Sequence, residues 1–210
     1  MKKIFLLLVL IGASILGYFI YQRISHQYER GLTSKPPTPS LSVALSPAMP
    51  YAPPIAQFRE RITKKPFGIY ITPENSPVSP ERFRGYHTAI DVEFGDTEED
   101  VPVYAITSGQ VTLSRIASGY GGVVILESET DGQKRSILYG HLRPSALPEV
   151  GKVFEKGDQI GLLGAGFTPE TDSERKHLHF AVLADNRIDI TGYVQTQAEL
   201  SGWIDPLTLY

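Results

Sequence analysis

The chain has 210 residues and a hydrophobic fraction of 41%, which suffices for one domain with a substantial core plus appendages. Its formal net charge of -3 gives no indication of nucleic-acid binding. The absence of cysteine excludes disulfides, thiolate-bound zinc and a lipid-acylated cysteine, and it leaves His, Asp and Glu as candidate metal ligands.

The N-terminus has the pattern of a membrane anchor. Lys2 and Lys3 precede an uncharged run over residues 4–21, which as a helix would span about 27 Å, close to the hydrocarbon thickness of a bilayer. The run continues beyond the small residues that a signal peptidase would need, so an uncleaved anchor is favoured over a signal peptide. We expect residues 1–30 to form a single-pass anchor and its flank, with the N-terminus inside and the rest of the chain outside.

A proline-rich segment follows the expected anchor. Seven prolines lie between Gly31 and Pro54, and prolines at this density exclude a helix and favour an extended polyproline II tether. The sequence therefore predicts a linker over residues 31–57 and a folded domain over residues 58–210.

The predicted folded domain consists of short strands. Roughly ten strand-like segments recur at spacings near ten residues, with glycine at the turns, and this pattern is typical of an all-β, antiparallel sandwich or barrel. Helical periodicity is absent apart from a possible single turn at residues 195–200. Two irregular segments, residues 73–84 and 164–176, are candidates for the walls of a substrate groove, because binding residues are frequent in such loops.

Three histidine-containing segments are candidates for a metal site. His177 and His179 are two residues apart on a predicted strand, so their side chains share one face. His87 and Asp91 are four residues apart and share a face if the strand at residues 89–94 extends back to His87. His141 ends another predicted strand. Alone, His177 and His179 fit a metal pair and exposed imidazoles equally well, whereas His87 with Asp91 alone favours exposed polar residues and His141 alone indicates no site. A metal site therefore requires that the three segments converge.

The order of these segments carries a resemblance to a known family. The motifs are HxxxD at 87–91, YxHL at 139–142 and HxH at 177–179, with glycine-bearing turns between them. Together they resemble the LytM/lysostaphin-type zinc metallopeptidases, the M23 peptidase family, over about residues 67–206. The resemblance implies an all-β domain in which Zn²⁺ is bound by His87, Asp91 and His179, while His141 and His177 are catalytic histidines that do not bind the metal.

The chemistry of this residue set is consistent with the resemblance. Two neutral imidazoles and one carboxylate are a normal zinc set, and three protein ligands leave a fourth position for water. Zinc lowers the pKa of such a water to about 7 and polarises a carbonyl group. No HExxH motif supplies a glutamate base, so we expect His141 and His177 to deprotonate the water and stabilise the oxyanion, with their individual roles open. Tyr86 and Tyr139 are interpreted as structural.

The resemblance also implies a substrate and a location. We expect a zinc-dependent endopeptidase that hydrolyses peptide bonds in peptidoglycan, held on the bacterial cytoplasmic membrane with its catalytic domain extracytoplasmic. The alternative is a non-catalytic envelope adaptor that activates other wall hydrolases, and the hairpin at residues 151–161 also resembles a lipoyl or biotinyl carrier. The complete His/Asp set favours the enzyme. The bond that is cleaved and the oligomeric state have no signature in the sequence.

Overall fold

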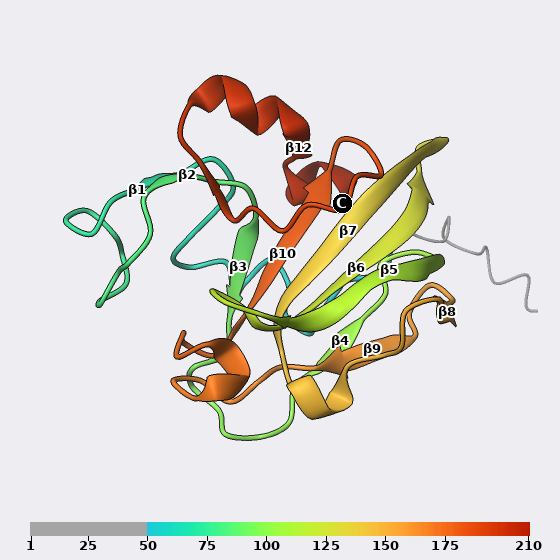
Figure 1. Cartoon of the computed structure of the whole chain (residues 1–210), viewed down its shortest axis with the longest axis horizontal. Coiled ribbons are helices and arrows are strands. Elements are labelled where there is room, and N and C mark those ends of the chain that lie inside the picture. The colour runs from blue at the N-terminus through green and yellow to red at the C-terminus, as the bar shows by residue number, and fades with distance from the viewer. Residues whose placement is uncertain (1–49) are drawn as a thin grey trace, which may run out of the picture. The chain divides into compact units, whose positions relative to one another are not determined.

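Short strands and 3₁₀ helices make up residues 50–210, the part of the chain that the computed structural model describes (Figure 1). The strands are β1 (Tyr70–Ile71), β2 (Gly85–His87), β3 (Ile90–Glu93), β4 (Pro102–Tyr104), β5 (Gly109–Ala117), β6 (Gly121–Thr130), β7 (Gln133–Leu142), β8 (Val153–Phe154), β9 (Gln159–Leu162), β10 (His177–Leu183), β11 (Tyr193–Val194) and β12 (Trp203–Ile204). The helices are η1 (Pro144–Ala146), η2 (Pro169–Thr171), η3 (Gln197–Gly202) and η4 (Pro206–Leu209).

One large sheet organises the domain. Its strand order is β12-β10-β7-β6-β5-β8. Strand β12 pairs with residues 182–183 of β10, and β3 pairs with residues 177–180 of the same strand. Two smaller sheets have the orders β1-β2-β11 and β4-β9. All strand pairings in residues 50–210 are antiparallel, so the predicted antiparallel β class is confirmed for this part of the chain. The helical turn expected near residues 195–200 is present as η3.

Strand β10, drawn in orange in Figure 1, lies between β3 and β7 at the centre of this arrangement. Every residue of β10 is buried, because apolar side chains cover both faces of the sheet. Leu178 and Phe180 belong to the larger core on one face, whereas Ala181 belongs to a smaller apolar cluster on the other. Because successive side chains of a strand point to opposite faces of the sheet, His177 and His179 lie on the same face as Ala181 and the smaller cluster. The predicted division of β10 into a core face and a histidine face is confirmed.

The start of the folded region differs from the sequence-based expectation in one respect. Tyr51 and Ile55 fall within the predicted linker, yet both are buried in the larger core. The Tyr104 main-chain N–H donates to the carbonyl of Pro54, which ties this segment to β4. Packed structure therefore begins before residue 58.

The predicted membrane anchor, residues 1–30, lies outside the described residues, as does most of the predicted linker. Between residues 50 and 210, no helix has the length and hydrophobicity needed to span a membrane.

Candidate metal centre and catalytic pocket

Three side chains from three strands converge at one end of β10. His179 of β10 lies directly opposite Asp91 of β3 in the sheet register, and His87 is the last residue of β2. The Nε2 atom of His87 is 3.2 Å from Nδ1 of His179 and 3.4 Å from Oδ1 of Asp91, and the remaining pair is 3.1 Å apart. All three side chains are buried. This is the group that the sequence predicted as the metal ligands.

The route by which His87 reaches this group differs from the expectation. The sequence suggested one continuous strand from His87 to Asp91, but β2 ends at His87 and the chain bends at residues 88–89 before β3 begins. The two strands belong to different sheets. The bend is held by Thr88, whose hydroxyl donates to the carbonyl of Thr191. His87 therefore approaches Asp91 because the chain turns a corner, and not because residues four apart share a strand face.

The hydrogen-bond partners of His87 and His179 leave one nitrogen of each ring as an acceptor. In each case it is the nitrogen that faces Asp91. Nδ1 of His87 lies 3.2 Å from the carbonyl of Pro66 and donates to it, which leaves Nε2 without a proton. The Tyr120 hydroxyl donates to the carbonyl of Ile190, so it accepts from Nε2–H of His179 and leaves Nδ1 of that ring unprotonated. Two lone pairs and a carboxylate oxygen then face one another with no proton between them, which is the donor set of a cation site.

The spacing of these atoms also fits zinc. Zinc–nitrogen and zinc–oxygen bonds of about 2.0–2.1 Å in a tetrahedron place neighbouring ligand atoms about 3.3 Å apart. The three distances, 3.1–3.4 Å, lie around this value. These three residues also form a group of three His, Asp or Glu side chains whose ligand atoms all lie within 4.8 Å of one another, and no other such group is found among residues 50–210. The residues therefore fit a zinc ion with one coordination position left for water or substrate.

The two oxygens of Asp91 have different neighbours. Oδ1 faces the two histidine ligands, whereas Oδ2 accepts a hydrogen bond from Nη2 of Arg175. The guanidinium is itself buried and also binds both carboxylate oxygens of Glu93 at 3.0 Å. Burial opposes ionisation of Asp91, but the attraction of its charged surroundings, among them the permanent cation of Arg175, outweighs it and holds the pKa of Asp91 well below its usual range. Asp91 is therefore an ionised carboxylate with one oxygen directed at the metal position.

His141 reaches the site because β7 contains a bulge. In the register of β6 and β7, Gly122 pairs with Leu142 and Val123 pairs with Gly140, so His141 has no partner across the strands. Its φ angle is +60°, a left-handed conformation that is unfavourable for a residue with a Cβ atom. In a regular strand, His141 would share the face of Tyr139, which is in the core. The bulge re-aims its ring to the face of His177 and His179.

The rings of His141 and His177 lie close together beside the predicted ligands. Their ring centroids are 4.1 Å apart, with an angle of 40° between the planes. Nδ1 of His177 donates to the carbonyl of Arg175 at 2.8 Å, so Nε2 is the acceptor nitrogen of this ring. Burial lowers the pKa of His141 to about 3 and lowers the pKa of His177 well below its ordinary value. Both imidazoles are therefore neutral near pH 7 and able to accept a proton.

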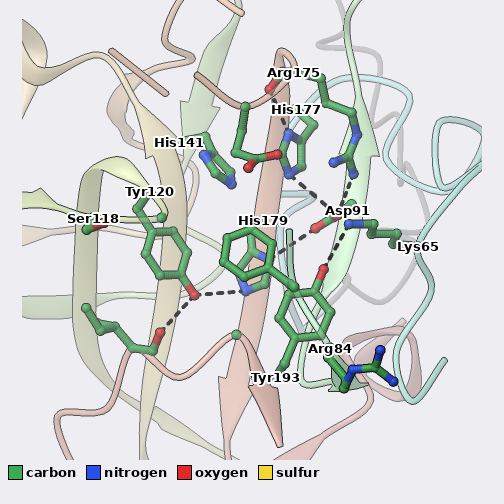
Figure 2. Close-up of a pocket in the computed structure, with 15 residues that line it drawn as sticks. Lys65, Arg84, Asp91, Ser118, Tyr120, His141, Arg175, His177, His179 and Tyr193 are labelled. Carbon is green, nitrogen blue, oxygen red and sulfur yellow. Dashed lines mark hydrogen bonds and ion pairs between the residues drawn. The ribbon is translucent and has the colours of Figure 1, made fainter. Parts of the chain in front are cut away.

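Four of these residues, Asp91, His141, His177 and His179, line a pocket of about 320 Å³, shown in Figure 2. The imidazoles and Asp91 lie on one side, and the aromatic rings of Tyr120 and Tyr193 lie beside them. Nδ1 of His141 has no hydrogen-bond partner although it is buried. The pocket thus combines a metal-type donor set, two neutral bases and space for a ligand.

The structure adds four residues that the sequence had not predicted as part of the site. Tyr120 fixes the tautomer of His179, Arg175 binds Asp91, and the ammonium of Lys65 donates to the Tyr193 hydroxyl at the pocket wall. A hydrogen-bond partner drawn from a distant strand has no local sequence pattern. Among the described residues, the side chains of the two tyrosines interpreted as structural have other partners: the Tyr139 hydroxyl accepts from the main-chain N–H of Ile106 on the core face, and the ring of Tyr86 packs on Tyr70.

A His–Asp–His donor set beside two neutral histidines is the arrangement of a metal-dependent hydrolase. The sequence matches the model of peptidase family M23 over residues 85–190, and the chain belongs to this family. No curated protein matches the sequence.

The chain is also similar to solved structures, among them the following three. Helicobacter pylori Csd3 is 25% identical with a TM-score of 0.44, and the match covers 70% of this chain and 35% of Csd3. LytU is 28% identical with a TM-score of 0.45, covering 70% of this chain and 81% of LytU. A zinc-containing peptidase from Vibrio cholerae is 24% identical with a TM-score of 0.42, covering 68% of this chain and 39% of that peptidase. The match thus spans little more than a third of Csd3 and of the Vibrio peptidase.

Proposed function

We propose that this protein is a zinc-dependent endopeptidase that hydrolyses peptide bonds in peptidoglycan. The observation that carries the proposal is the convergence of three proton-free ligand atoms, from His87, Asp91 and His179, next to the neutral pair His141 and His177. Membership of the M23 family supports a peptidase activity, and the family resemblance supplies the substrate class.

The chain's own residues divide the chemistry between binding and proton transfer. His87, Asp91 and His179 would hold the zinc ion, which supplies Lewis acidity that acidifies a water molecule and polarises the peptide carbonyl. The carbonyl of Arg175 holds a proton on Nδ1 of His177, so Nε2, which lies 3.5 Å from Oδ2 of Asp91, is the nitrogen that would take the proton of the attacking water.

His141 suits the complementary role. Its Nδ1 atom is buried without a hydrogen-bond partner, and its ring lies against that of His177 at the pocket wall, with the two planes tilted. Because no protein group binds Nδ1, this ring can present an N–H to the developing oxyanion, and the proton taken up by His177 then passes to the leaving amine. The complete set of five residues also argues against a purely non-catalytic adaptor, which needs neither a metal site nor a base.

Peptidoglycan hydrolysis tests this function directly. The full chain, purified in detergent and loaded with zinc, should release new amino termini from purified peptidoglycan. Release should stop after treatment with a chelator and return when zinc is added back. A chain that binds no zinc at micromolar concentration would disprove the enzyme proposal, whereas zinc binding without release of wall fragments would favour the adaptor.

We propose in addition that the catalytic domain works outside the cytoplasmic membrane of a bacterium. The support is the uncharged run at residues 4–21 behind Lys2 and Lys3. Protease added to intact spheroplasts should then degrade the domain. Full protection in spheroplasts, with degradation only after lysis, would overturn this orientation.

A further inference from the structure

A second hollow adjoins the catalytic pocket. It has a volume of about 350 Å³ and shares Glu174 and Arg175 with the catalytic pocket as a common wall. Val78 and Pro80 line it from the loop between β1 and β2, and Phe167 lines it from the loop before β10.

The two loops that form this hollow are fastened to each other. The guanidinium of Arg82 donates to the carbonyl of Asp172 at 2.9 Å and to Oε1 of Glu174 at 2.8 Å. These bonds join residues about ninety positions apart in the sequence. The hollow is therefore formed before a ligand binds, which lowers the entropic cost of binding.

Phe167 is held in an unusual conformation at the rim. Its side chain is 72% exposed and its φ angle is +58°, and its main-chain N–H donates to the carbonyl of Glu174 at 2.7 Å. Asp172 and Ser173 in the same loop also have positive φ angles. A rigid loop that places an aromatic ring in solvent with strained backbone is a feature of binding sites and has no benefit for packing.

Lys64 is the cation of the hollow that is most available to a ligand. The guanidinium groups of Arg82 and Arg175 are occupied by short ion pairs. The ammonium of Lys64 is instead 3.7 Å from Oε2 of Glu93, and its side chain is 42% exposed. Lys64 also lines the shallower depression that continues beyond the hollow, together with Phe167 and Arg175.

We propose that this hollow is a subsite for an acidic residue of the substrate peptide, one that lies beyond the cleaved bond. The methylene part of that residue packs against Val78, Pro80 and the ring of Phe167, and its carboxylate pairs with Lys64. The subsite rests on the proposed peptidase function for its occupant, because continuity with the catalytic pocket is what identifies the ligand as part of the same peptide.

Kinetics with paired substrates test the subsite. Cross-linked peptide dimers released from peptidoglycan are used with their side-chain carboxylates either free or amidated. Lys64→Gln should raise KM about three- to tenfold for the free form, leave kcat unchanged and have no effect on the amidated form. Phe167→Ala should raise KM by a similar factor of about three to ten for both forms, since packing on the ring does not require the charge.

Two surface variants serve as controls. Lys134→Gln removes an exposed lysine that pairs with a glutamate away from the hollow, and Ile116→Ala removes an exposed apolar side chain from β5. Both should behave as the unmodified chain with both substrates. Equal KM values for Lys64→Gln and Lys134→Gln with the free-carboxylate dimer would overturn the subsite.

Calorimetric binding to the chelator-treated chain separates this proposal from the proposed function. No turnover occurs without metal, so the affinities for free and amidated dimers can be compared directly. A loss of affinity in Lys64→Gln restricted to the free form supports the subsite even if no wall peptide is cleaved. Cleavage by the unmodified chain, combined with identical affinities in all variants, would leave the enzyme in place and disprove the subsite.

Discussion

Arg175 and Asp91 form a buried ion pair that leaves one carboxylate oxygen free for the metal position. The guanidinium donates to Oδ2 of Asp91, and Oδ1 faces the two histidine ligands. The main-chain carbonyl of Arg175 also binds Nδ1 of His177. One residue thus orients a predicted ligand through its side chain and a predicted base through its backbone, which makes Arg175 a positioning residue for both halves of the site.

Replacing Arg175 by methionine should weaken zinc binding. Without the guanidinium, Asp91 is free to rotate or to bind through both oxygens, and loss of such an outer partner typically lowers metal affinity about 10- to 100-fold. Competition with a fluorescent chelator measures the affinity. The visible absorption of the Co²⁺-substituted chain should also fall, because an added carboxylate oxygen takes the ion away from tetrahedral geometry.

Arg84→Met is the matched control for this variant. Arg84 also lines the catalytic pocket, but it is exposed and pairs only with Glu74 among the ion pairs of the described residues. The Arg84→Met variant should leave the zinc affinity and the Co²⁺ spectrum unchanged. Zinc binding by Arg175→Met that equals or exceeds that of the unmodified chain would contradict the positioning role.

Tyr120→Phe tests whether the tautomer of His179 is set by its hydroxyl partner. The Tyr120 oxygen accepts from Nε2–H of His179 and donates to the carbonyl of Ile190. Loss of the Tyr120 hydroxyl should lower zinc affinity about tenfold. It should also lower the free energy of unfolding by about 1 kcal/mol. Tyr139→Phe is the control, since it removes an equally buried hydroxyl that binds Ile106 on the opposite face of the sheet.

The two tyrosine variants should therefore agree in urea denaturation and differ in zinc titration. Tyr139→Phe loses a hydrogen bond of the same kind but does not alter any group that contacts His179. If both variants bind zinc as tightly as the unmodified chain, the hydroxyl of Tyr120 has only a packing role.

Much of the site could be predicted because alternation and motif order are local properties. The spacing of His177 and His179 placed both imidazoles on one face of a strand, and the structure has them there. The third histidine, His141, was assigned from its motif, but the bulge that turns it toward the pocket depends on the register of β6 and β7. A register of this kind is set by pairing with another strand, so residues 139–142 alone do not reveal it.

The parts that escaped prediction depend on contacts between distant segments. The corner at residues 88–89 arises because β2 pairs with β11 while β3 pairs with β10, and no turn motif marks it. Tyr120 and Arg175 act through hydrogen bonds to residues 59 and 84 positions away. The burial of Tyr51 likewise follows from tertiary packing, which overrides the extended preference of a proline-rich sequence.

His179→Ala and His141→Ala should separate metal binding from catalysis. His179 supplies one of three ligand atoms, so its loss should remove zinc from the purified chain, as elemental analysis would show. His141 supplies none, and His141→Ala should retain one zinc per chain while hydrolysis falls about 10²- to 10⁴-fold. Loss of zinc from His141→Ala would instead identify that histidine as a ligand.

Glu81→Gln should destabilise the domain near pH 7 and less so in acid. The carboxylate of Glu81 is buried against the ammonium of Lys65, and it accepts from Ser76 and Phe83. Burial alone would raise its pKa, but these partners outweigh it, so the pKa in the folded chain is lowered.

The stabilisation of the fold by the Glu81 carboxylate is therefore complete above the unfolded pKa of about 4.3, and it is lost as pH falls through the folded pKa. Leaving the ammonium of Lys65 buried without a counter-ion should cost about 3 kcal/mol at pH 7. In urea denaturation the difference from the unmodified chain should shrink below about pH 4, whereas Glu74→Gln, at an exposed pair, should show little difference at either pH. A gap for Glu81→Gln that stays constant from pH 7 to pH 3 would refute the ionised pair.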